Sequence, residues 1–150
     1  MLGPMNDRLQ PYFGQFSLTG DLGSDVTAVL THYHLPRVAG HVARVAREAR
    51  QLATRFGADP DQAETAAWLH DISAVIPNPA RVALCAAFNI PVLPGEAAFP
   101  MILHQKLSAV VAQEGFGVTE TAVLRAIGCH TTLKAGASLL DKIVFVADKI

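Results

Sequence analysis

The chain has 150 residues, of which 51% are hydrophobic and 17% are charged. This is enough apolar material for one well-buried domain, but the chain is too short for two ordinary domains. Twelve Lys and Arg residues against thirteen Asp and Glu residues give a net charge of -1. That balance excludes a broad basic field, so we expect no binding to polymeric DNA or RNA by backbone electrostatics.

Cysteine usage and hydropathy indicate whether the protein is cytoplasmic, secreted or bound to a membrane. Cys85 and Cys129 are the two cysteines, and they form neither a CxxC pair nor the framework of a small secreted scaffold. We interpret both as reduced thiols in the core. The sequence has no run of about 18 consecutive apolar residues, and its N-terminus lacks the basic-then-apolar order of a secretory signal. We therefore expect a soluble, cytoplasmic protein without a membrane partner.

The first twenty residues differ in pattern from the rest of the chain. They contain glycine and proline breaks and no sustained hydrophobic period, so residues 1–20 are predicted to be a loosely ordered N-terminal extension. Apolar residues recur at three- and four-residue steps in much of the remainder. Residues 21–150 are predicted to form a single domain.

Three helices are predicted in the first half of this domain. A short helix begins at Asp21, and a long amphipathic helix covers residues 38–56 until Gly57 ends it. Asp59-Pro60-Asp61-Gln62 combines an N-cap acid with a proline at the first helical position. This motif predicts a third helix, which ends at His70-Asp71.

Prolines interrupt the middle of the chain, and further helices are predicted after it. A short helix is predicted over about residues 80–88, and Pro91, Pro94 and Pro100 mark a loop that is a candidate pocket wall. Three further helices are predicted at residues 101–114, 119–130 and 138–148, with a turn at residues 131–137. Ser138 and Asp141 form a capping box at the start of the last helix. Because no useful strand alternation is present, the predicted fold class is all-α.

Six ionisable residues lie on the apolar faces of five different predicted helices, and they are His41, His70, Asp71, His104, His130 and Asp148. Residues so placed can converge inside a helical bundle. Burying them without partners would cost roughly several kcal/mol each, which together is about the whole stability of a small domain. Metal ions or mutual hydrogen bonds would satisfy them, and a metal centre is the more economical explanation. Imidazole and carboxylate ligands without thiolate suit Fe, Mn, Zn, Co or Mg.

Single residues of this kind have simpler interpretations. A lone histidine on an apolar helix face is more often a hydrogen-bonded core residue than a ligand, so the metal hypothesis depends on the whole set. His32 and His34 would face different directions on a helix, and we interpret them as surface or cap residues. Trp68 is interpreted as a core residue.

The order of these residues resembles a known family. His41, His70-Asp71 and Asp148 resemble the H…HD…D signature of the HD superfamily, and the resemblance covers residues 35–150. Ile102-Leu103-His104 and the segment from His130-Thr131-Thr132 to Ala147-Asp148 resemble its YqeK-type branch. Members of that branch are bacterial hydrolases that split diadenosine tetraphosphate symmetrically into two ADP. The resemblance implies an all-α HD-domain helical bundle.

The resemblance also implies a metal site with two ions. In it, His41, His70, Asp71 and Asp148 bind one ion, and Asp71 bridges to a second ion held by His104 and His130. The ions would be divalent or of mixed valence, with iron favoured and Mn, Co, Zn or Mg as alternatives. They would lower the pKa of a bound water for in-line attack on phosphorus. His70 and Asp71 are the expected catalytic residues.

Four residues are candidates for contacts with a nucleotide substrate, and they are Lys134, Thr131, Thr132 and Lys106. Lys134 is the best phosphate candidate, because it follows His130-Thr131-Thr132 in a turn. The threonines fit phosphate binding and turn capping about equally well.

The sequence departs from the family pattern at several positions. Ala74 replaces a usual lysine, Leu133-Lys134 replaces Gly-Arg, and Gln105-Lys106 replaces Gly-Pro. Lys134 keeps a positive charge without the bidentate fork of arginine. The family pattern continues past the last aspartate, whereas this sequence ends at Ile150.

Three functions stay open on these grounds. The first is symmetrical hydrolysis of diadenosine tetraphosphate, and the second is hydrolysis of another nucleotide or phosphomonoester, which the changed residues motivate. The third is a non-catalytic, nucleotide-binding regulatory module. A homodimer is a further hypothesis, because a helical chain that is 51% hydrophobic can leave apolar surface for a second copy.

Overall fold

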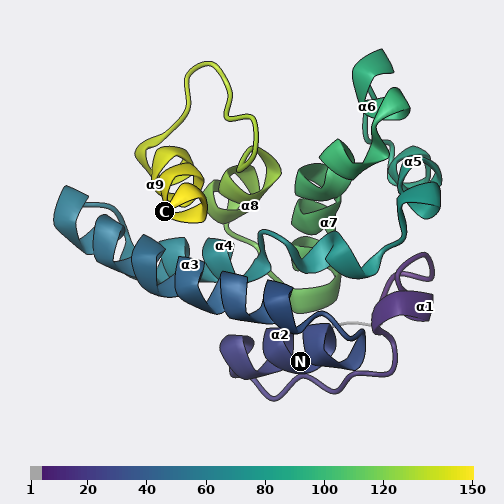
Figure 1. The fold of residues 1–150 in the computed structure, drawn as a ribbon, viewed down its shortest axis with the longest axis horizontal. Coiled ribbons are helices and arrows are strands. Elements are labelled where there is room, and N and C mark those ends of the chain that lie inside the picture. The colour runs from purple at the N-terminus through teal and green to yellow at the C-terminus, as the bar shows by residue number, and fades with distance from the viewer. Residues whose placement is uncertain (1–4) are drawn as a thin grey trace.

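The computed structural model describes residues 5–150, and every regular element in them is helical (Figure 1). The all-α prediction is therefore confirmed. The elements in chain order are α1 (Gln10–Phe13), α2 (Leu22–His32), α3 (Pro36–Phe56), α4 (Pro60–Leu69), the 3₁₀ helix η1 (Ile72–Val75), α5 (Asn78–Ala87), α6 (Pro94–Ala98), the 3₁₀ helix η2 (Pro100–Leu103), α7 (His104–Phe116), α8 (Thr121–Gly128) and α9 (Leu139–Lys149).

Helix α4 lies at the centre of the bundle. It packs against α3, α8 and α9, and also contacts α2 and α7. In Figure 1, α3 crosses the front of the molecule, with α4 behind it, α8 and α9 above it and α2 below it. The buried face of α4 consists largely of alanine (Ala63, Ala66 and Ala67), and such small side chains let several neighbours approach closely. The end of α4 is thereby surrounded by other helices.

The predicted helix caps are present. The Asp59 side chain accepts hydrogen bonds from the backbone N–H groups of Asp61 and Gln62 at the start of α4. Ser138 and Asp141 form the predicted capping box of α9. Helix α3 ends at Gly57, whose φ of 83° favours glycine. Local sequence signals thus correctly predict where α3 ends and where α4 and α9 begin.

The loop predicted around Pro91, Pro94 and Pro100 is wrong in part. Pro94 begins α6 and Pro100 begins η2. A proline at the first helical position loses nothing, because its missing N–H would have no partner within the helix. Helix α7 correspondingly begins at His104, three residues later than predicted, because η2 occupies the preceding turn.

The N-terminal segment packs on the bundle where the structure describes it. Leu9 and Phe13 are buried, and the Phe13 ring meets the Phe116 ring edge to face, with centroids 6.4 Å apart. The backbone N–H and hydroxyl of Thr19 both donate to Asp25 on α2. Residues 1–4 of the predicted extension lie outside the described residues, and the division of the chain at residue 21 stays a prediction.

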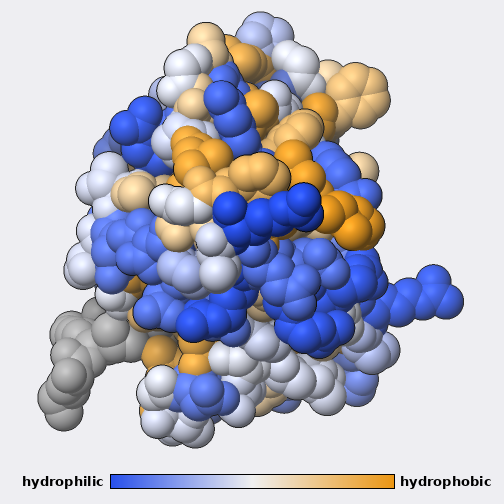
Figure 2. All heavy atoms as spheres, turned by 90° about the vertical axis from the view of Figure 1, so that its left-hand side faces the viewer, coloured by the Kyte–Doolittle hydropathy of each residue, from blue (hydrophilic) through white to orange (hydrophobic). Residues whose placement is uncertain are grey.

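The surface mixes polar and apolar regions. Figure 2 shows the face at the left of Figure 1, where hydrophilic residues form a band across the middle and hydrophobic residues gather above it. Large apolar side chains that stay exposed include Leu139 and Val146 on α9 and Phe56 at the end of α3. Among the described residues, no helix is both long enough and apolar enough to cross a membrane.

Candidate metal centre

Helix ends bring the six predicted ligands together. His41 lies in the second turn of α3, and Asp148 lies in the last turn of α9. His70 caps α4, Asp71 follows it, and His104 is the first residue of α7. His130 lies two residues beyond the end of α8 at Gly128, so its predicted place on a helix is wrong. Helix ends suit this role, because a side chain there can point along the helix into a shared space.

Four of the six residues form a first group, in which each offers one ligand atom and all these atoms lie within 4.8 Å of one another. Asp148 Oδ1 lies 2.8 Å from His41 Nε2 and 3.2 Å from His70 Nε2. Asp71 Oδ2 lies 3.3 Å from His70 Nε2 and 3.7 Å from His41 Nε2. Two imidazoles and two carboxylates therefore surround one point.

Asp71, His104 and His130 form a second group under the same distance limit. Asp71 Oδ1 lies 3.5 Å from His130 Nε2 and 3.6 Å from His104 Nε2. The two imidazole Nε2 atoms are themselves 2.9 Å apart. Asp71 thus turns one carboxylate oxygen to each group, which is the arrangement of a bridging ligand.

Backbone carbonyls orient three of the four rings in the same way. The Nδ1 atoms of His70, His104 and His130 lie 2.5, 2.8 and 2.7 Å from the carbonyl oxygen three residues earlier. A carbonyl oxygen only accepts, so Nδ1 must carry the proton in each ring, and Nε2 is left with its lone pair when the ring is neutral. Histidines that bind metal are oriented by such bonds.

The contact between His104 and His130 tests whether a cation fits the site. Both rings donate from Nδ1, so the Nε2 atoms that lie 2.9 Å apart present lone pairs to each other when both rings are neutral. Two lone pairs at this distance repel unless a proton or a metal ion lies between or beside them. The donor set of the second group therefore fits a metal ion.

His41 is oriented differently. Its Nδ1 lies 2.9 Å from Arg44 Nη2, and because a guanidinium only donates, Nδ1 accepts this bond. A neutral His41 then carries its proton on Nε2, which donates to Asp148 Oδ1 at 2.8 Å. Binding of a metal ion at Nε2 requires the proton on Nδ1 instead, and Arg44 then has to give up its bond.

The electrostatics of the cluster favour positive charge at its centre. Burial alone lowers the pKa of His70, but hydrogen bonds with Asp148 and Asp71 outweigh it and raise the pKa from 6.5 to about 10. Burial likewise opposes ionisation of Asp71, yet His130 and His70 hold its pKa well below the ordinary value. Burial and then the charge of His130 lower the pKa of His104. Ionised carboxylates facing imidazoles are what a metal cation requires.

The four candidates for substrate contacts lie in different surroundings. Thr131 Oγ1 is 3.2 Å from His104 Nε2, and Thr132 Oγ1 accepts a hydrogen bond from Gln105 Nε2 at 3.1 Å. Lys134 Nζ lies 3.9 Å from Asp141 Oδ2 in the turn after His130. Lys106 Nζ pairs with Glu96 Oε1 at 2.7 Å and donates to the Pro91 carbonyl, so the structure joins it to the α6 segment and not to the ligand cluster.

Sequence reasoning missed three polar residues that support the site. Gln105 is buried, and its Oε1 accepts the backbone N–H of Thr131 at 2.9 Å. Lys149 Nζ donates to Asp148 Oδ2 at 3.0 Å and to the His130 carbonyl at 3.3 Å. Arg81 is buried on α5, and its spacing from Leu84 and Cys85, which share that face, is the signal that could have found it.

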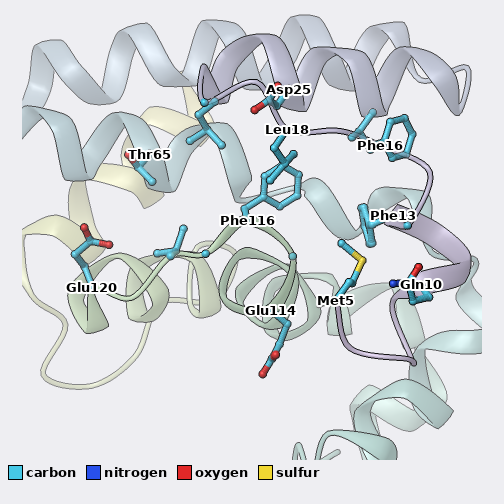
Figure 3. Close-up of a pocket in the computed structure, with 17 residues that line it drawn as sticks. Met5, Gln10, Phe13, Phe16, Leu18, Asp25, Thr65, Glu114, Phe116 and Glu120 are labelled. Carbon is cyan, nitrogen blue, oxygen red and sulfur yellow. The ribbon is translucent and has the colours of Figure 1, made fainter. Parts of the chain in front are cut away.

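A cavity near the N-terminal segment lies apart from this cluster. It has a volume of about 800 Å³ and is lined by the N-terminal segment, α2 and the junction of α7 and α8, and none of the six predicted ligands borders it. Figure 3 shows Phe13, Phe16 and Phe116 around this space. Residues of α7 that line it, such as Glu114, are at the opposite end of that helix from His104. This cavity is therefore separate from the candidate metal centre.

Comparisons with known proteins agree with this architecture. Residues 38–150 match the HD domain family. A protein of Lactococcus lactis subsp. cremoris described as "Uncharacterized protein in pepC 5'region" is 51% identical over 59% of this chain and 46% of its own length. The "Bis(5'-nucleosyl)-tetraphosphatase, symmetrical" of Bacillus subtilis (strain 168) is 34% identical over 73% of this chain and 59% of its own length. The chain thus spans about half the length of these relatives.

A solved structure has the same fold. It is a "predicted HD superfamily hydrolase involved in NAD metabolism" from Clostridium acetobutylicum, which aligns with a TM-score of 0.80 at 26% identity over 85% of this chain and 67% of its own length. The family match covers three quarters of the chain and includes all six residues of the two groups. The chain therefore belongs to the HD domain family.

Proposed function

We propose that this protein is a metal-dependent phosphohydrolase that cleaves diadenosine tetraphosphate symmetrically into two ADP, with water activated at a binuclear metal centre. The observation that carries the proposal is the position of Asp71, whose two carboxylate oxygens face two separate sets of imidazoles. The proposal also draws on the relatives named as symmetrical tetraphosphatases in Bacillus subtilis and Halalkalibacterium halodurans.

His41, His70, Asp71 and Asp148 would hold one ion, and Asp71, His104 and His130 would hold the other. The set contains nitrogen and oxygen donors without sulfur, which suits Fe, Mn, Co or Zn, and we favour iron. When bound, the ions lower the pKa of a water molecule and neutralise charge on the phosphoryl oxygens. His70 and Asp71 are the proposed catalytic residues, because they belong to the group around which that water is activated.

Residues of the turn after His130 are the proposed contacts with the substrate. Thr131 Oγ1 lies beside His104 Nε2 and can donate to a phosphoryl oxygen at the same point. The Lys134 ammonium lies 3.9 Å from Asp141 Oδ2, and the lysine side chain stays partly exposed and able to meet a polyphosphate. In symmetrical cleavage, water adds to one central phosphorus, the bridging oxygen leaves with the other half, and two ADP result.

A second candidate is hydrolysis of another nucleotide or phosphomonoester at the same centre. It is favoured by the solved neighbour, which is described as involved in NAD metabolism, and by Lys134, which lacks the fork that suits a phosphate. A non-catalytic nucleotide-binding module is the third candidate. We place the protein in the cytoplasm under each of them, since both cysteines are unpaired and buried thiols.

A substrate panel tests the proposal. Purified protein is loaded with Fe, Mn or Co in turn and incubated with diadenosine tetraphosphate, NAD and nucleoside monophosphates, beside a His70→Ala variant. We expect ADP as the sole product from diadenosine tetraphosphate and no turnover by the variant. ATP plus AMP would contradict symmetrical cleavage. Release of phosphate from monophosphates alone would favour the second candidate, and tight nucleotide binding without any product would favour the third.

A further inference from the structure

Arg81 is a buried cation that the site described so far does not use. It lies on α5 with 6% of its surface exposed, and no carboxylate pairs with it among residues 5–150. Its guanidinium is instead fixed by two backbone carbonyls. Nε donates to the Ile76 oxygen at 3.1 Å, and Nη1 donates to the Met101 oxygen at 3.2 Å.

These two carbonyls belong to the segments that carry two ligands of the second group. Ile76 caps η1, the 3₁₀ turn that begins directly after Asp71. Met101 lies in η2, the turn that leads directly into His104. The planar guanidinium presents its donors in a rigid fork, so Arg81 sets the spacing between the segment of Asp71 and the segment of His104.

The Met101 oxygen accepts a second hydrogen bond, and its donor is His104 Nδ1 at 2.8 Å. Arg81 and His104 therefore share one acceptor. This bond fixes the proton on Nδ1 and turns Nε2 toward Asp71 Oδ1, 3.6 Å away. A carbonyl that moved or rotated would release the ring, and hydrogen-bond partners of this kind change metal affinity about 10- to 100-fold when they are lost.

Stability alone does not account for an arginine at this position. Burial lowers the pKa of Arg81, while the charge of Asp71 opposes that change, so the guanidinium stays charged in a poorly solvated place. An apolar side chain of similar volume would avoid the cost of desolvating a cation. Ser73 provides a second contact between these segments, because its Oγ donates a hydrogen bond to the His104 carbonyl at 2.8 Å. Arg81 and Ser73 thus join the segment after Asp71 to the segment of Met101 and His104.

We propose that Arg81 is a positioning residue for the second metal ion, because it holds the Met101 carbonyl that orients His104. This inference rests on the proposed binuclear centre. It does not extend to the first group, whose histidines His41 and His70 are held by other partners, Arg44 and the Ala67 carbonyl.

The test is metal titration of wild-type protein and of Arg81→Met and Arg81→Lys variants, with manganese as the probe and stoichiometry read by calorimetry. Methionine fills a similar volume without donors, and lysine keeps the charge but cannot donate to both carbonyls in the same fork geometry. Arg50→Met is the matched control, since Arg50 also makes two hydrogen bonds, to Asp61 and Glu64, on the outer surface. Circular dichroism checks that each variant is folded.

We expect both Arg81 variants to bind the second ion about 10- to 100-fold more weakly and the first ion with wild-type affinity, and Arg50→Met to match wild type. Wild-type affinity for both ions in Arg81→Lys would assign the effect to charge and overturn the inference. An equal loss of affinity for both ions, or no loss of affinity for either ion, would also overturn it. A wild-type protein that binds one ion would refute the binuclear centre itself, which separates that failure from this one. If Arg81→Met does not fold, Arg81→Lys alone decides between these results.

Discussion

His104 and His130 face each other with their Nε2 atoms 2.9 Å apart, although both rings carry their proton on the opposite nitrogen. The two rings come from segments 26 residues apart in the chain, so when both rings are neutral the fold holds an unfavourable contact between two acceptors in place. A cation removes the repulsion. The stability of the bundle should therefore depend on a bound metal ion.

Removal of metal is expected to destabilise the protein. An ion present at about 100 times its dissociation constant adds ~2.7 kcal/mol to the free energy of unfolding, which corresponds to roughly 5 to 10 °C in the melting temperature of a domain of this size. Differential scanning fluorimetry with and without a chelator measures this shift. His130→Ala keeps the first group and lacks one ligand of the second, so its shift should be smaller than that of the wild-type protein. His34→Asn, at an exposed position with a φ of 59° that asparagine tolerates, should keep the full shift.

Substitution of the two aspartates should have different effects on metal content. Asp71 faces both groups, whereas Asp148 belongs to the first group alone. We expect Asp71→Asn to lose tight binding of both ions and Asp148→Asn to keep the ion of the second group. Elemental analysis after desalting gives the two stoichiometries, and equal loss in the two variants would contradict a bridging role for Asp71.

Loss of Arg44 should strengthen binding at the first group. Arg44 donates to His41 Nδ1 and so stabilises the proton arrangement that opposes a metal ion on Nε2. Arg44→Met removes this one hydrogen bond, worth ~1 kcal/mol, and should raise the affinity for the first ion about fivefold. Metal titration of this variant beside Arg47→Met, an exposed neighbour on the same helix, measures the difference. Weaker binding in Arg44→Met would show that the guanidinium supports the ligand instead.

Kinetic measurements should show which of Lys134 and Lys106 contacts the substrate. Lys134 follows the second group and stays partly exposed, whereas Lys106 is engaged by Glu96 and the Pro91 carbonyl. We expect Lys134→Met to raise the KM for diadenosine tetraphosphate about tenfold, equivalent to ~1.4 kcal/mol of lost binding. Lys106→Met should lower the melting temperature and leave KM within about twofold. A rise in KM for Lys106→Met alone would reverse the assignment.

Much of the fold follows from local sequence signals. Glycine, proline and capping residues gave most helix boundaries, and Asp59 and Ser138 cap the helices as predicted. The same signals failed at Pro94 and Pro100, because a proline can begin a helix as well as end one. His130 was predicted on a helix, but the backbone leaves the helical path after Gly128.

The site was predictable only in part, for a physical reason. Residue type and the resemblance to a family singled out the six candidate ligands, which the structure brings into two groups. The residues that orient them were not found, because their contacts join distant segments. Arg81 meets Met101 across 20 residues, and Gln105 meets Thr131 across 26. No local pattern encodes such pairs.

The central claim, a centre of two metal ions bridged by Asp71, is tested most directly by the metal content of the purified protein. We expect elemental analysis to find about two equivalents per chain, with iron the favoured metal. One equivalent or less, even after reconstitution with iron, manganese, cobalt or zinc under anaerobic conditions, would contradict the account, because the six candidate ligands would then not form two ion sites.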